Sequence, residues 1–230
     1  MRNSCTKCST LGIVVLMLFF VNSTLINDNP IETISNKEIS VEPLRKSAAS
    51  LSELANQKFY MKEDQIQEEE YDSIVTFGKA FVNLYTRAVA KQETVSFENY
   101  ISNTNLLKFT DKMLELEQKQ QLKGASSVKF RLDNEFKEDE YKKLDENLYY
   151  LSLPFVNEGS GMTSKLLVQS ANQSLEIVDL YFGYKDGVDT LATGHPAVRK
   201  LDNPKLWDDQ EWVEGVFGKL EKYESELSSK

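Results

Sequence analysis

The sequence contains a single histidine, His195, in the segment TGHPAVRK, where the following Pro196 fixes a turn. A zinc cluster of histidines needs several such ligands, and a Ser-His-Asp triad could form only if this one residue served in it. The sequence has no glycine-rich phosphate loop, no metalloprotease helix and no nucleophile elbow. We therefore expect His195 to be structural or exposed rather than catalytic, and we expect no bound cofactor.

Cysteines and clustered acids are the other residues that could hold a metal. Cys5 and Cys8 form a Cys-x-x-Cys pair ahead of an apolar segment, without the two further ligands nearby that a metal site needs. We expect them to be incidental residues of a leader. Residues 186 to 189 (DGVD) lack the alternate ligand spacing and the distal glutamate of a calcium loop, so we interpret them as a turn. We expect no metal site.

The N-terminus has the layout of a secretory signal peptide. Residues 11 to 21 are uninterrupted apolar sequence, preceded by Arg2 and Lys7 and followed by polar residues. The apolar stretch reaches about 16 residues if it extends to residue 26, short of the roughly 20 that span a bilayer, so cleavage is favoured over an uncleaved anchor. Residues 1 to 23 are thus a signal peptide or a membrane anchor, and membrane contact is expected only through residues 11 to 26. Both readings make the rest of the chain extracytoplasmic, either secreted or anchored to the cell membrane.

The composition narrows the classes of partner and the compartment. The 230 residues include 36 acidic and 27 basic side chains, a net charge of −9, so the basic footprint of a nucleic-acid-binding protein is missing. No cysteine follows residue 8, and an exported domain without disulfides fits a bacterial envelope better than a eukaryotic secretory pathway. A hydrophobic content of 40% is enough for one globular core.

Hydrophobic periodicity predicts helices followed by a sheet. Residues 24 to 64 read as a polar spacer with a weak helix near residues 44 to 55, and residues 65 to 230 as a single α+β domain. Aromatic and aliphatic residues at helical spacing predict a core helix from residue 68 to 91, a second helical region from 97 to 123, and a last amphipathic helix from 208 to 227.

Four runs predict an antiparallel meander. They are residues 128 to 136, 148 to 156, 164 to 171 and 175 to 184, and short turn sequences separate the last three. The charged residues 137 to 147 are expected to form a solvated excursion. The fold class that follows is α+β, with N-terminal helices packed on a curved four-stranded antiparallel meander and a C-terminal amphipathic helix.

This element order, including the helix FGKAFVNLYTRAV and the paired aromatic strands, resembles the nuclear transport factor 2-like (NTF2-like, or cystatin-like) superfamily over residues 71 to 184. The resemblance implies helices enclosed by a strongly curved sheet, in the shape of a cone. Members with an N-terminal membrane segment and an exported domain include subunits of conjugation and secretion machines. The final helix after Pro204 departs from the minimal superfamily pattern.

The resemblance also implies an enzymatic hypothesis, since NTF2-like enzymes use an Asp and Tyr pair inside an apolar cavity that raises the carboxyl pKa. Asp179 and Tyr181 are expected on one face of the last strand, flanked by Ile177. Tyr149 and Leu151 of the second strand could share that cavity. The alternative is that Asp179 lies at a strand edge near solvent or pairs with a lysine.

Three functional hypotheses remain. The favoured one is an exported, non-enzymatic domain that binds an envelope protein or a small ligand. The second is an NTF2-like enzyme whose catalytic residues are Asp179, Tyr181 and Tyr149. The third is an accessory subunit of a conjugation or secretion machine, which requires the apolar segment to stay uncleaved.

Overall fold

The computed structural model describes residues 49–61, 66–126, 129–132, 134–157, 160–184 and 187–229, which belong to one compact unit. They form helices and a five-stranded antiparallel sheet, so the predicted α+β class with a C-terminal helix is confirmed. The elements are α1 (Leu51–Asn56), α2 (Gln67–Lys91), α3 (Thr104–Lys123), β1 (Glu135–Phe136), β2 (Glu140–Asp145), β3 (Leu148–Asn157), β4 (Ser160–Ala171), β5 (Ser174–Tyr181), α4 (Val188–Thr193), a 3-10 turn η1 (Leu206–Asp208) and α5 (Gln210–Ser228). The predicted leader, residues 1 to 23, lies outside the described residues.

The sheet is a meander in the order β1-β3-β4-β5, and β2 also pairs with β3. β1 and β2 follow one another along the same edge of β3, because Phe136 pairs with Phe155 and Glu140 pairs with Ser152. The edge strand therefore advances four residues where β3 advances three, which is the signature of a bulge. The expectation that residues 137 to 147 form only a solvated excursion is wrong.

Tyr141 explains why such a charged segment pairs as a strand. Its ring lies against Tyr71 of α2 at a centroid distance of 5.5 Å and against Tyr149 of β3 at 5.9 Å, and its hydroxyl donates to Glu70 Oε1 at 2.7 Å. The other side chains of β2 are exposed. Charged residues at an exposed sheet edge oppose edge-to-edge association, so the charges are compatible with an edge strand. The strand predicted for residues 128 to 136 is shorter than expected. Among the described residues of that range, only the two residues of β1 are in a strand.

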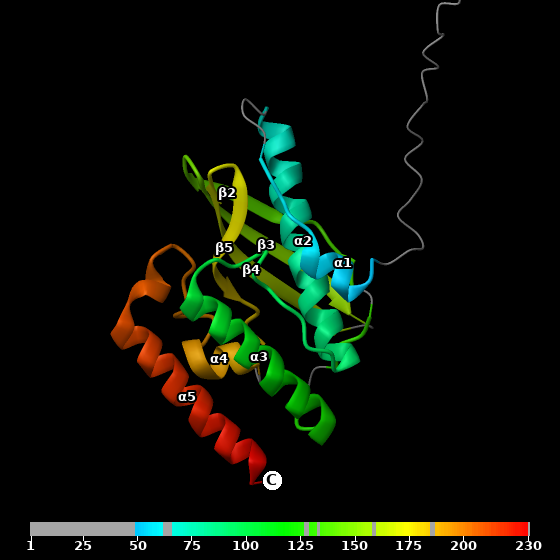
Figure 1. Cartoon of the computed structure of the whole chain (residues 1–230), viewed down its shortest axis with the longest axis vertical. Helices are drawn as coiled ribbons and strands as arrows, with labels where there is room; N and C mark the ends of the chain where they lie inside the picture. Colours follow the sequence, from blue (N-terminus) through cyan, green and yellow to red (C-terminus); the bar gives the residue numbers. More distant parts are fainter. Residues whose placement is uncertain are drawn as a thin grey trace, which may run out of the picture. The chain divides into compact units, whose positions relative to one another are not determined.

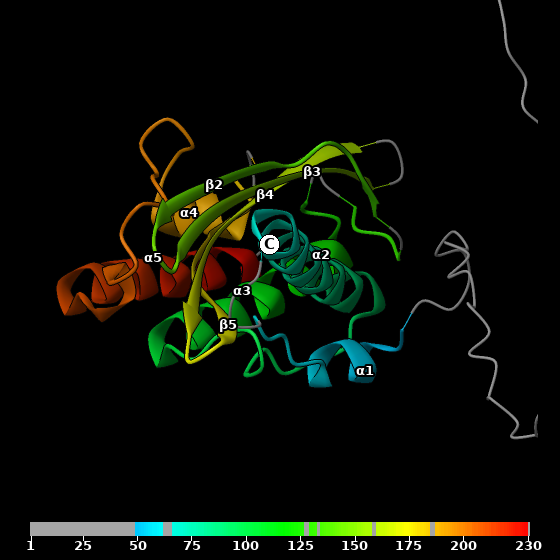
Figure 2. The same ribbon diagram turned by 90° about the horizontal axis from the view of Figure 1, so that it is seen from above.

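Helix α2 fills the concave face of the sheet (Figure 2). Alternate residues of β3 point at it and are buried, including Leu151 and Leu153. The helix approaches closely because Gly78 has no side chain. A Cβ at that position would overlap Leu151 Cδ2 and lie 3.1 Å from Leu153 Cδ1. The predicted enclosure of a helix by a curved sheet thus has a specific packing basis at Gly78.

The free edge of β5 is covered by the chain that precedes α2. The backbone N–H of Met61 donates to the Gln173 carbonyl at 2.7 Å, and that of Leu175 donates to the Phe59 carbonyl at 3.1 Å. The helix expected near residues 44 to 55 is present as α1, which begins at a capping box between Ser50 and Glu53. The segment expected as a spacer therefore contributes backbone pairing and buried leucines to the fold.

Helices α3, α4 and α5 pack together below the sheet (Figure 1). Helix α5 is capped at its N-terminus by Asp209, whose side chain accepts a hydrogen bond from the Trp212 N–H at 3.1 Å. Lys112 and Lys119 of α3 both reach Glu224 of α5, at 2.7 and 2.6 Å. Residues 187 to 207 contain α4 and the start of η1, so the turn expected at residues 186 to 189 instead leads into a short helix. Among the described residues, no helix has both the length and the apolar character needed to cross a bilayer.

Candidate functional site

The three residues proposed as a catalytic set lie on opposite faces of the sheet. Asp179 and Tyr181 face away from α2, as their pairing with Leu167 and Lys165 shows, while Tyr149 is buried on the α2 side. The shared cavity expected for these residues is therefore wrong. The physical cause is a bulge in β5: Leu167 pairs with Asp179 but Val168 pairs with Ile177, so the strand contains one extra residue. Simple alternation wrongly placed Ile177 beside Asp179.

Asp179 belongs to a buried ion pair. Its Oδ1 accepts hydrogen bonds from Arg199 Nη2 at 2.5 Å, from Trp207 Nε1 at 2.9 Å and from the Leu180 N–H at 2.9 Å. The carboxyl is fully buried, and the side chain of Arg199 is only 5% exposed. Burial raises the pKa of Asp179, while the charge and hydrogen bond of Arg199 oppose that rise.

The Asp179 pair attaches the chain after α4 to the sheet. The Arg199 guanidinium also lies over the Trp212 ring at 5.6 Å, and Trp207 stacks near Phe109 of α3 at 4.7 Å. One carboxylate thus joins β5, the loop before η1 and, through Arg199, helix α5. The alternative of pairing at a solvent-exposed edge with a lysine is also wrong, since the partner is a buried arginine.

The two tyrosines of the proposed set have structural partners. The hydroxyl of Tyr181 donates to the Gly194 carbonyl at 2.9 Å and lies 3.2 Å from Thr190 Oγ1, which ties β5 to the end of α4. The hydroxyl of Tyr149 donates to Glu70 Oε2 at 3.2 Å. The Glu70 carboxylate also accepts hydrogen bonds from the Tyr141 hydroxyl and the Lys143 ammonium, so it joins α2 to the edge strand of the sheet.

His195 is an exposed residue in a turn. Its Nδ1 accepts a hydrogen bond from the Ala197 N–H at 3.3 Å, and its own carbonyl accepts from Val198 and Arg199. No group of three or more potential metal-binding side chains occurs within the part of the chain that the structure describes.

A buried set of acids and tyrosines, which the sequence did not reveal, lies between α2, α3 and α4. We call it the acid–tyrosine cluster; it consists of Tyr85, Glu117, Tyr184 and Asp189. Glu117 Oε1 accepts the Val188 N–H at 3.1 Å, which connects the middle of α3 to the first residue of α4. Each of the four residues is at most 9% exposed, so their carboxyl and hydroxyl groups are removed from water.

The side chain of Asp189 in α4 binds the backbone that immediately follows β5. Its Oδ2 accepts from the Phe182 N–H at 2.6 Å and from the Gly183 N–H at 2.8 Å. Gly183 has a φ of 67°, a left-handed conformation that glycine adopts without strain, and this turn aims both N–H groups at the carboxylate. Asp189 Oδ1 and the hydroxyls of Tyr85 and Tyr184 are buried without a hydrogen-bond partner among the described residues.

Burial and mutual repulsion govern proton binding in this cluster. The pKa of Glu117 is raised to about 8, mainly by burial and further by the nearby negative charge of Asp189. Burial also raises the pKa of Asp189, and it raises the pKa of Tyr85 well above its ordinary value. Glu117 therefore holds a proton at neutral pH and is able to donate it, which is the property required of a buried general acid.

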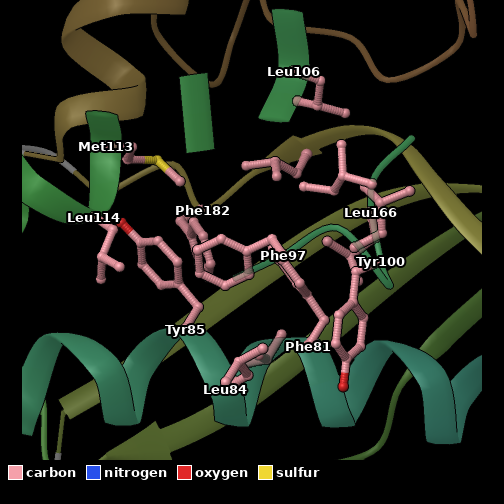
Figure 3. Packing of buried hydrophobic residues seen from close by; sticks show 14 of the residues in the cluster. Phe81, Leu84, Tyr85, Phe97, Tyr100, Leu106, Met113, Leu114, Leu166 and Phe182 are labelled. Carbon is pink, nitrogen blue, oxygen red and sulfur yellow. The ribbon is translucent and has the colours of Figure 1, made fainter. Parts of the chain in front are cut away.

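The cluster is packed in rather than open. Tyr85 stacks on Phe182 with ring centroids 4.8 Å apart, and its hydroxyl end lies beside Met113 and Leu114 (Figure 3). Four hollows of 630, 700, 410 and 330 Å³ are lined by other residues. The chemistry of an acid with a raised pKa is present, whereas these hollows give a substrate no access to it.

A more complete reading of the α3 stripe could have located one half of the cluster. Residues 106, 109, 113 and 116 define the buried face, and Glu117 follows Met113 by four positions on that same face. Asp189 left no such signal, because the helix that carries it has only six residues.

Comparisons with known proteins identify no relative. No protein-family model matches the chain, and neither the curated proteins nor the solved structures include a match. The relationship to the NTF2-like superfamily stays a prediction that rests on element order.

Proposed function

We propose that the protein is an exported, non-enzymatic domain of the bacterial cell envelope that binds a partner through its outer surface. The observation that carries this proposal is the filled concave face of the sheet. Superfamily enzymes would use that face as a cavity, but here the side chains of α2 occupy it. Phe81 and Tyr85 of α2 meet Phe97, Tyr100 and Phe182 in one aromatic core (Figure 3).

The packing at Gly78 supports the same proposal. Leucine side chains of the sheet fill the space against the helix at this point, so an added methyl group would have to displace the end of Leu151. Ligand sites of the usual kind are concave volumes of several hundred Å³. A binding function therefore belongs to the outside of the molecule, where the hollows described above lie.

Export is tested by the mature N-terminus and the location of the full chain. The gene would be expressed with a C-terminal epitope in a bacterium with a single membrane, and the intact mass of the purified product measured. We expect a chain that begins near residue 24 and is digested when protease is added to whole cells. A chain that retains Met1 and is protected from protease would contradict the proposal. A chain that retains Met1 but is digested would instead favour the accessory subunit of an envelope machine.

The second candidate is an enzyme, and the acid–tyrosine cluster is the observation that favours it. Its chemistry would be general acid catalysis by Glu117, with Tyr85 as a neighbouring hydroxyl. This function requires a small molecule to reach the cluster. Met113 lies beside Tyr85 and is 1% exposed, so its methyl group is a reporter of such entry.

Methyl NMR decides between the two candidates. The protein would be labelled with ¹³C-methyl methionine and titrated with a library of small fragments, with Met162 of β4 as the internal control. For a surface-binding domain we expect no fragment to shift the Met113 signal selectively. A fragment that shifts Met113 in the wild type, leaves Met162 unchanged and loses its effect in Tyr85→Phe would support the enzyme.

A further inference from the structure

The structure contains an acidic groove between α3 and the chain that joins it to α2. The groove has a volume of about 630 Å³, which is within the range of pockets that bind drug-sized ligands and is large enough for side chains of a peptide. Its apolar floor is formed by Val95, Leu107 and Leu114, and its rim by Glu98, Asp111 and Glu115. No lysine or arginine lines it.

The groove has fixed walls. The Gln118 side chain donates to the carbonyls of Ala88 and Glu93, both at 3.0 Å, and so holds the end of α2 against α3. Gln92 ends α2 in the left-handed conformation with a φ of 59°, and the next residues descend into the groove wall. A preformed groove loses little conformational freedom when a partner binds, which favours affinity.

Charge in the groove is left uncompensated at two of the three acids. Glu115 pairs with Lys112 at 3.0 Å and with Lys119 at 2.6 Å. Glu98 and Asp111 have no ion-pair partner among the described residues. The pKa of Asp111 is raised by burial and by the negative charge of Glu98, so each ionised acid disfavours the other. A cation placed between them would relieve that repulsion.

The apolar floor selects the type of cation. Leu114 is 3% exposed, whereas Val95 and Leu107 are only partly buried against the core, so the apolar surface that the groove offers a partner comes mainly from Val95 and Leu107. A metal ion or a polyamine gains little from covering such a surface. A segment with a lysine or arginine beside an apolar residue complements both the apolar floor and the acidic rim. Its apolar side chain is buried on the floor while its cation neutralises the rim.

We propose that this groove docks a cationic, amphipathic segment of a partner protein, with an apolar side chain on the floor and a lysine or arginine at Glu98 and Asp111. The inference rests on the proposed binding function and names the chemical class of its partner. The overall charge of −9 agrees in sign and would steer such a segment towards the protein.

A defined peptide tests the assignment. The full chain would be titrated into a fluorescein-labelled peptide of alternating lysine and leucine, with its glutamate and leucine counterpart and spermidine as comparison probes. The variants are Glu98→Gln with Asp111→Asn, and a control of equal charge change on α5, Glu214→Gln with Glu221→Gln. We expect the groove variant to weaken lysine peptide binding about tenfold and the control to change it less than twofold.

Three results would overturn the docking site. They are absence of lysine peptide binding at moderate salt, an equal loss in the groove and α5 variants, and spermidine that competes as well as the peptide. The first would show that the groove is not a site, the second that only net charge acts, and the third that the apolar floor has no part. None of them bears on export, which the mature N-terminus tests separately.

Discussion

Replacement of Glu117 by glutamine isolates the energetic effect of a buried acid. Glu117 is 3% exposed, its pKa is raised to about 8, and in the unfolded chain it would return to about 4.5. Between these values the native state binds more protons than the unfolded state. The free energy of unfolding therefore falls as pH rises from 4.5 to 8, by up to about 1.4 kcal/mol per pH unit. Above pH 8 this contribution is constant, because the residue is ionised in both states.

Glutamine removes this dependence without removing the contact. Its side-chain oxygen can still accept the Val188 N–H that Glu117 accepts at 3.1 Å. Between pH 5 and pH 7 the wild type should lose about 2.5 kcal/mol relative to Glu117→Gln, slightly less than two pH units at the full slope because the unfolded residue is still partly protonated at pH 5. We expect the variant to match the wild type at pH 5 and to be the more stable protein at pH 7 and above.

Urea unfolding at pH 5, 6, 7 and 8, followed by tryptophan fluorescence, measures the effect. Glu115→Gln is the matched control, because Glu115 lies two residues earlier, is half-exposed, and has a pKa lowered by Lys119 and Lys112. Acids that do not interact with Glu117 contribute equally to all three proteins, whereas Asp189 is coupled to Glu117, so the difference between wild type and Glu117→Gln reports the pair. Parallel stability curves for the wild type and Glu117→Gln from pH 5 to 8 would refute the reasoning.

Three further predictions concern the fold. Arg199→Met should cost about 3 to 5 kcal/mol in urea unfolding, because it leaves Asp179 buried without its partner, and a cost below about 1 kcal/mol would show that the pair is not structural. Gly78→Ala should lower the free energy of unfolding by about 1 to 3 kcal/mol through overpacking. Its control is Gly215→Ala, where a Cβ meets nothing within 4 Å and the free energy of unfolding should rise by about 0.5 to 1 kcal/mol. Equal shifts of the thermal midpoint in the two variants would contradict the tight helix–sheet contact. Tyr141→Ser should lower amide hydrogen-exchange protection in β2 and spare β4, and retained protection in β2 would mean that its ring contacts do not hold the edge.

The sequence was most informative where burial is continuous. Helix α2 and strand β3 were predicted close to their observed bounds, because their apolar residues recur at helical spacing or on nearly every residue, whereas β4 begins four residues and β5 ends three residues earlier than predicted. β2 was missed because five of its six side chains are exposed and charged or aliphatic, and only Tyr141 is partly buried. A strand with a single partly buried side chain leaves no periodic signal.

The candidate site failed for a reason of register. Alternation along residues 175 to 184 correctly put Asp179 and Tyr181 on one face, yet the extra residue in β5 reversed the face of Ile177. A bulge cannot be read from apolar periodicity, since both faces of this strand are buried and Val178 fits either one. The same extra residue places Asp179 on the face away from α2, whereas Tyr149 lies on the α2 face. The three expected residues therefore do not share one site.

The two buried carboxyl centres of this fold keep the chain after β5 in place by different means. Asp179 is paired with the buried Arg199 guanidinium and holds the segment before η1, whereas Glu117 is neutralised by its own proton and holds the start of α4. Removal of charge therefore has opposite consequences at the two positions. Asp179→Asn strands a buried guanidinium, while Glu117→Gln completes a neutralisation that is already present at pH 7. The first is thus a fixed structural joint, and the second makes the attachment of α4 depend on pH.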